Sequence, residues 1–106
     1  HNRRVLELLR QDCAFDDAGI NAWARRWISA GFDALETMLA ADQARGDFCH
    51  GGAPTLADVY LVPQVESARR FGVELARWPL IGAVDAACDR LEAFQRAAPA
   101  VQPDAP

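Results

Sequence analysis

The sequence lacks the local signatures of most catalytic and metal-binding domains. It contains no lysine, no Cys-x-x-Cys pair, no glycine-rich phosphate loop, no Gly-x-Ser-x-Gly motif and no clustered His/Asp/Glu set. No apolar run approaches the roughly 18 residues of a membrane span, and no signal peptide is recognised, so we expect no membrane association. Strand-like alternation and internal repeats are also missing. A metal site is therefore not expected, and no catalytic group is evident.

Composition favours one all-helical domain over residues 1–106. The hydrophobic fraction is 51%, but roughly a fifth of the chain is alanine, the best intrinsic helix former. A chain of 106 residues can bury a core without disulfides or metals. The net charge of −4 argues against nucleic-acid binding, which needs a basic face.

The three cysteines, Cys13, Cys49 and Cys88, are odd in number and widely spaced. This pattern favours neither a disulfide framework nor a zinc site. We expect buried free thiols in a reduced cytoplasm. Because the chain begins at His1 without a methionine, we also expect it to be part of a longer protein, with its first helices truncated.

Helix signals predict a bundle of about five helices. Their expected ranges are 3–11, 16–41, 55–71, 79–88 and 91–97, with a main loop over 42–54 and an extended tail over 99–106. The long second helix should bury a stripe at three- and four-residue steps: Ile20, Trp23, Trp27, Ile28, Leu35, Met38 and Leu39. Gly31 lies in that stripe and indicates close approach of another helix.

The segment from Pro54 to Phe71 carries the strongest local signal. Thr55 and Asp58 are spaced as an N-cap and its reciprocal partner, with Asp in place of the usual Glu or Gln. The following helix is expected to carry Leu56, Val59, Tyr60 and Val62 into the core, and to continue past the internal Pro63. Gly72 suits the C-terminal cap, and Pro79 suits the first turn of the next helix.

Two arginine pairs are candidate anion-binding groups. If Asn2 caps the first helix, Arg3 and Arg4 lie in its first turn, where the helix dipole disfavours cations unless an anion is bound there. If the helix begins upstream, they are ordinary surface arginines. Arg69 and Arg70 stand at a helix end that favours cations, so a structural role suffices for at least one of them. Arginine binds carboxylates in bidentate fashion, so a carboxylate site requires convergence of the two pairs.

Other polar and aromatic residues have simpler interpretations. His50 follows Cys49, but no third group has metal or triad spacing, which favours a solvated loop histidine over a nucleophile pair. The three tryptophans, Trp23, Trp27 and Trp78, are interpreted as core anchors rather than as a ligand platform.

Several motifs resemble the C-terminal domain of zeta-class glutathione transferases, the family that includes maleylacetoacetate and maleylpyruvate isomerases. They are Phe48-Cys49, Pro54-Thr-Leu-Ala-Asp58, Leu61-Val-Pro-Gln-Val65, Ala68-Arg-Arg-Phe71 and Gln102-Pro103-Asp104, together with Asn2-Arg3-Arg4-Val5-Leu6. The Thr-to-Asp cap is shared by the whole superfamily, whereas LVPQV, ARRF and QPD are specific to the zeta class. Gly52 and Ala98 depart from the usual aspartate and histidine.

The resemblance implies a cytoplasmic, homodimeric two-domain enzyme whose thioredoxin-like N-terminal domain, with the thiol-activating residue, is absent from this chain. In the family reaction, the glutathione thiolate adds to a cis double bond, the new single bond rotates, and glutathione leaves to give the trans isomer. The substrates are small diacids. By this resemblance, Arg70 and Arg4 are expected to bind substrate, and Asn2 and Arg3 glutathione, while the chain alone should be inactive.

Two other functions stay open. A broader zeta-type transferase could use the same thiol and anion site to conjugate or dehalogenate small haloacids. A non-catalytic helical module for dimerisation or binding is the alternative from a different class. In each case an incomplete domain predicts an exposed apolar face on the first helices.

Overall fold

The protein, described over residues 3–105 by a computed structural model, is all-helical, as predicted. Within these residues there are five α-helices and two short 3₁₀ turns, and no strand. The helices are α1 (Arg3–Gln11), α2 (Asp17–Ala41), α3 (Leu56–Arg70), α4 (Pro79–Asp89) and α5 (Glu92–Ala97), and the turns are Leu75–Arg77 and Pro99–Val101.

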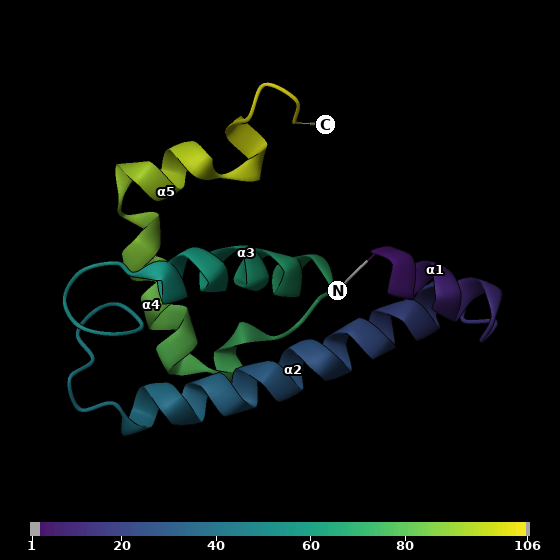
Figure 1. The fold of residues 1–106 in the computed structure, drawn as a ribbon, viewed down its shortest axis with the longest axis horizontal. Coiled ribbons are helices and arrows are strands. Elements are labelled where there is room, and N and C mark those ends of the chain that lie inside the picture. The colour runs from purple at the N-terminus through teal and green to yellow at the C-terminus, as the bar shows by residue number, and fades with distance from the viewer. Residues whose placement is uncertain (1–2, 106) are drawn as a thin grey trace.

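The long helix α2 forms the base of the molecule (Figure 1). Helix α4 packs against both α2 and α3, while α1 contacts α2 and α5 follows α4. The molecule measures 46 × 36 × 21 Å, and its radius of gyration is 15.4 Å. A compact chain of this length has a radius of about 13 Å. The domain is therefore thin and open.

Local signals set the helix ends where the sequence placed them. The side chain of Asp16 caps α2 by accepting the backbone N–H of Gly19 at 2.8 Å. At the end of α3, Gly72 has a φ of +68°. Its N–H donates to Arg69 O, and the next N–H donates to Ala68 O. These are the two bonds of a Schellman motif, which glycine favours because it adopts positive φ without strain.

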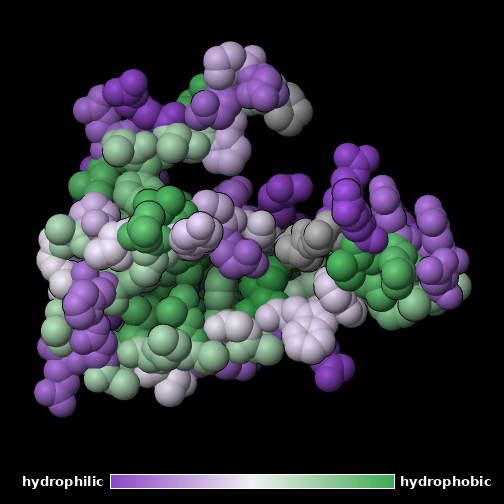
Figure 2. Space-filling view, in the orientation of Figure 1, coloured by the Kyte–Doolittle hydropathy of each residue, from purple (hydrophilic) through white to green (hydrophobic). Residues whose placement is uncertain are grey.

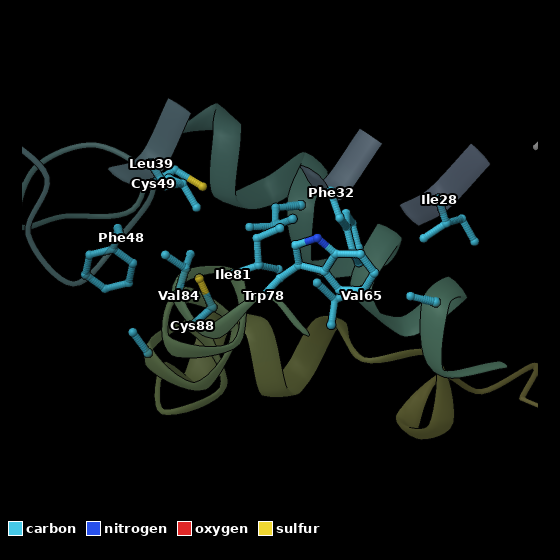
Figure 3. Close-up of a cluster of buried hydrophobic side chains, with 13 residues drawn as sticks. Ile28, Phe32, Leu39, Phe48, Cys49, Val65, Trp78, Ile81, Val84 and Cys88 are labelled. Carbon is cyan, nitrogen blue, oxygen red and sulfur yellow. The ribbon is translucent and has the colours of Figure 1, made fainter. Parts of the chain in front are cut away.

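The core lies where α2, α3 and α4 meet (Figure 3). Trp78 is only 2% exposed, which confirms it as a core anchor. Its ring packs edge-to-face on Phe32, with 5.3 Å between the ring centroids. Other buried members are Ile28, Leu39, Leu61, Val65, Ile81, Val84 and Cys88. Most come from faces of three helices with three- and four-residue spacing, which is the pattern of an amphipathic bundle.

Part of the predicted core is wrong. Trp27 and Met38 on α2 are 56% and 67% exposed, and Trp23 and Leu35 are only half-buried. On α3 the exposed residues are Leu56, Val59 and Tyr60, because this helix turns Leu61, Val65 and Ala68 toward α4 instead. Of these residues, Trp27, Leu35 and Tyr60 line a groove between α2 and α3.

Three smaller predictions also need correction. A Cβ on Gly31 would meet no atom within 4 Å, so no helix among residues 3–105 approaches it closely. Cys13 is exposed, whereas Cys49 and Cys88 are buried. The C-terminal residues are not simply extended, since 99–101 form a 3₁₀ turn and the Gln102 amide donates to Arg96 O and Ala98 O.

Candidate functional site

The two arginines that end α3 have different environments. The Arg69 guanidinium pairs with Asp85 of α4 at 2.5 Å and with Glu66 at 3.5 Å. The hydrogen bond to Asp85 raises the pKa of Arg69 above its ordinary value. Arg70 is exposed and has no ion pair within the described residues. Arg69 therefore ties α3 to α4, while Arg70 keeps its donors available for an external anion.

Arg3 and Arg4 are the first two described residues of α1. The Arg3 side chain is 92% exposed and lies 3.6 Å from Glu7, one turn further along. Arg4 is also exposed and takes part in an interaction within the protein. No acidic residue occupies the first turn of α1. The predicted cap, Asn2, lies outside the described residues.

Convergence of these arginines stays a prediction. The described interactions of Arg3 and Arg70 do not join them to one another. In the view of Figure 1, α1 begins on the same side of the molecule as the end of α3.

The start of α3 is built around the buried carboxylate of Asp58. Thr55 and Asp58 form the reciprocal capping box. Asp58 accepts the Thr55 N–H at 2.7 Å and, from the preceding loop, the Cys49 N–H at 2.8 Å. Burial alone would raise the pKa of Asp58, but these hydrogen bonds hold it below its ordinary value. An ionised, fully satisfied carboxylate thus joins the loop to α3, which is a structural role.

Two acidic residues of α2 position α4, and the sequence reasoning missed both. Glu36 accepts the backbone N–H groups of Leu80 and Ile81 at 2.8 and 3.0 Å. It thereby caps a helix whose own N-cap residue, Trp78, supplies no side-chain hydrogen bond. Asp33 accepts the indole N–H of Trp78 at 2.7 Å. Both acids are distant in sequence from their partners, so no local motif marks them.

His50 and Cys49 do not form a nucleophile pair. His50 is exposed and bonds Asp42 at 2.6 Å, a contact that lowers the pKa of Asp42. Burial, together with nearby Asp58, raises the pKa of Cys49 to about 12. Burial likewise raises that of Cys88 to about 11. At neutral pH both thiols stay protonated and therefore unreactive.

An apolar groove runs between α2 and α3. Its volume is about 400 Å³, and Trp27, Leu35, Tyr60 and Leu61 are among its walls. Figure 2 shows hydrophobic side chains gathered over this region and again over α1, where Val5 and Leu8 are exposed. This is the exposed apolar surface that the sequence predicted.

Residues 3–105 offer neither a metal site nor a membrane-spanning helix. No group of three or more His, Cys, Asp or Glu side chains there could hold a metal ion. None of the helices described is both long and apolar enough to span a membrane.

Comparison with known proteins places the chain in a family. The family model for the glutathione S-transferase C-terminal domain matches residues 4–101. A maleylpyruvate isomerase from Ralstonia sp. is 64% identical over 104 residues, which cover 98% of this chain and 49% of that protein. The chain thus spans about half the length of this curated relative.

Solved structures give the same assignment. The holo structure of a maleylpyruvate isomerase, described as a bacterial zeta-class glutathione S-transferase, has a TM-score of 0.97 and 64% identity, over 99% of this chain and 50% of that one. A maleylacetoacetate isomerase from Anaeromyxobacter dehalogenans, with bound dicarboxyethyl glutathione and citrate, has a TM-score of 0.89 and 48% identity. The match covers 99% of this chain and 46% of that one. The chain therefore belongs to the glutathione S-transferase C-terminal domain family, in its zeta class.

Proposed function

We propose that the protein carrying this chain catalyses glutathione-dependent cis–trans isomerisation of a small unsaturated diacid, maleylacetoacetate or maleylpyruvate. The relatives described above carry the names of these activities. The observation on this chain that best supports the proposal is the contrast between Arg69, paired with Asp85, and its exposed neighbour Arg70. A diacid substrate needs a cation free of internal carboxylates, and Arg70 provides one.

The chain's own residues fit the carboxylates of such ligands. The first turn of α1 holds Arg3 and Arg4 and no acidic residue, so its N–H groups and guanidinium groups can face an anion together. We assign Arg70 and Arg4 to the substrate, and Arg3 with Asn2 to glutathione. Glutathione would supply the thiol that adds to the double bond, and these residues would bind and orient the charged ends. None of them activates the thiol, so the 106-residue chain by itself should be inactive.

The test uses the protein at its full encoded length. Isomerisation of maleylacetoacetate and of maleylpyruvate is followed with and without glutathione. Glutathione-dependent turnover of either diacid supports the proposal. Turnover of small haloacids with glutathione, but of neither diacid, favours the broader transferase. A protein that binds no glutathione and turns over neither class is a non-catalytic module.

The role of Arg70 is tested with Arg70→Gln. Loss of a charge-assisted hydrogen bond of about 1.5–3 kcal/mol lowers kcat/KM for the diacid roughly 10- to 150-fold. Arg70→Lys should restore part of this loss, because it keeps the charge but not the planar fork. The matched control is Arg90→Gln, since Arg90 is an exposed arginine at the far end of α4. Equal kinetics for Arg70→Gln and the control would remove Arg70 from the site.

We also propose that the exposed apolar surface packs against the rest of a two-domain protein and that this protein is a cytoplasmic homodimer. The open shape of the chain and the exposure of Trp27 and Tyr60 support a covering partner. The three free cysteines fit a reducing compartment. Light scattering after gel filtration gives the oligomeric mass, and a monomer would contradict the dimer.

A further inference from the structure

A second hollow lies on a different face of α2 from the apolar groove. Its volume is about 530 Å³, which falls among small-molecule pockets. One wall is a single face of α2, and the other is the segment over 72–77 that joins α3 to α4. In Figure 1 this segment runs back from the end of α3 toward α2. Ala22, Ser29 and Ala30 line the α2 wall, and their small side chains leave room against the helix.

The charge of this hollow is opposite to that of the chain. Three arginines line it (Arg25, Arg26 and Arg77) against two acids (Asp33 and Glu74), whereas the whole chain carries −4. Asp33 is already engaged, because its Oδ1 accepts the Trp78 indole N–H at 2.7 Å. A locally cationic concavity on an acidic protein favours an anionic ligand.

The arginines on its two walls keep unused donors. Arg25 makes one long hydrogen bond, from Nε to Asn21 O at 3.4 Å, and its Nη1 lies 3.9 Å from where a Cβ on Gly72 would stand. Its guanidinium thus reaches across to the opposite wall. The Arg77 guanidinium lies over the Trp78 ring at 4.6 Å and 3.8 Å from Asp33. Arg77 and Asp33 thus form an ion pair, but their distance exceeds that of a direct hydrogen bond, so the N–H donors of Arg77 stay available.

The two arginines belong to opposite walls of the hollow. Arg25 lies on the α2 wall, and Arg77 lies on the wall formed by residues 72–77. Each guanidinium can form charge-assisted hydrogen bonds with its own anionic group. A ligand with a carboxylate at each end therefore matches this arrangement.

We propose that this hollow binds a short, extended dicarboxylate, with one carboxylate at Arg25 and the other at Arg77. The small residues of α2 lie beside the carbon chain, and the two guanidinium groups fix its ends. None of Arg3, Arg4 and Arg70 lines this hollow, so the proposal does not depend on the isomerase function.

The experiment is a titration of the isotope-labelled protein, followed by two-dimensional NMR at the backbone amides of Ser29, Gly72 and Val73. Glutarate is the two-ended probe, butyrate the one-ended probe and inorganic phosphate the compact dianion. We expect saturable shifts with glutarate, and binding at least about fivefold weaker for the other two. Equal binding of butyrate or phosphate would overturn two-ended recognition, and no saturable glutarate shift would overturn the site.

Variants locate the ligand. Arg25→Gln removes one guanidinium and should weaken glutarate binding about fivefold. It should not disturb the fold, because among the described residues Arg25 makes just the long hydrogen bond to Asn21. Arg90→Gln makes the same charge change outside the hollow and should have no effect. An equal loss in Arg90→Gln would reduce the binding to general charge attraction. Loss of the shifts in Arg70→Gln would move the ligand to the end of α3, and either result refutes the proposal.

Discussion

Removing the Asp58 carboxylate should destabilise the protein by a predictable amount. Asp58 is fully buried and accepts hydrogen bonds from the Thr55 and Cys49 backbone N–H groups and from the Thr55 hydroxyl. In Asp58→Ala none of these donors keeps its acceptor. The Thr55 N–H lies at an exposed residue and can turn to water, whereas Cys49 is 7% exposed and its N–H stays without a partner.

The expected cost follows from these two environments. An unsatisfied buried N–H costs about 1–3 kcal/mol. Loss of the capping box adds about 1 kcal/mol. The sum is about 2–4 kcal/mol, a large part of the 5–15 kcal/mol that usually separates folded from unfolded domains. Asp58→Asn keeps one acceptor oxygen and should fall between Asp58→Ala and the wild type.

The measurement is urea unfolding followed by circular dichroism and tryptophan fluorescence. Asp47→Ala is the matched control, because Asp47 is an exposed acid in the loop that precedes α3. A surface substitution of this kind should change the free energy of unfolding by no more than about 0.5 kcal/mol. If Asp58→Ala costs no more than Asp47→Ala, the carboxylate does not hold the loop to α3, and the reasoning fails.

Three further predictions concern stability and reactivity. Glu36→Gln should lower the free energy of unfolding by about 1–2 kcal/mol, because a neutral amide caps α4 with only one oxygen; unfolding titrations should show no such loss for the exposed Glu66→Gln. Because the pKa of Asp58 is lowered in the folded state, its ionised carboxylate stabilises the fold fully above the unfolded pKa of about 3.9, and this stabilisation is lost as the pH falls through the folded pKa. Asp58→Asn should therefore flatten the acid limb of a plot of unfolding free energy against pH. An unchanged acid limb would contradict this. An aromatic disulfide reagent should label exposed Cys13 rapidly and the two buried cysteines only on unfolding, so rapid labelling of Cys13→Ser would refute the burial argument.

The sequence predicted the helices well because their ends depend on neighbours in the chain. Thr55 and Asp58 close a capping box over three residues, Gly72 adopts the positive φ that ends α3, and Pro79 enters the first turn of α4. Each feature is decided by backbone donors and acceptors within about one helical turn. The motifs between Thr55 and Phe71 also contributed to the family resemblance. They could be recognised without the fold, because each is a run of consecutive residues.

The candidate site could be predicted only in part. The sequence singled out Arg69 and Arg70 at the end of α3, but it could not tell which of them forms an ion pair within the protein. Asp85 is sixteen residues from Arg69 and meets it only because α3 packs on α4. The same holds for Glu36, which reaches the start of α4 from 44 residues away.

The sequence by itself therefore determined most helix ends of this protein, such as the capping box of α3 and the Gly72 turn that follows it, and that the chain is an all-helical domain of this family. Only the tertiary structure decided which apolar faces are covered, leaving Trp27 and Tyr60 exposed while Trp78 is buried. It also decided that Arg69 is bound and Arg70 is available. The physical reason is range: helix ends are set by hydrogen bonds between near neighbours, whereas burial and ion pairing depend on which distant segment packs alongside.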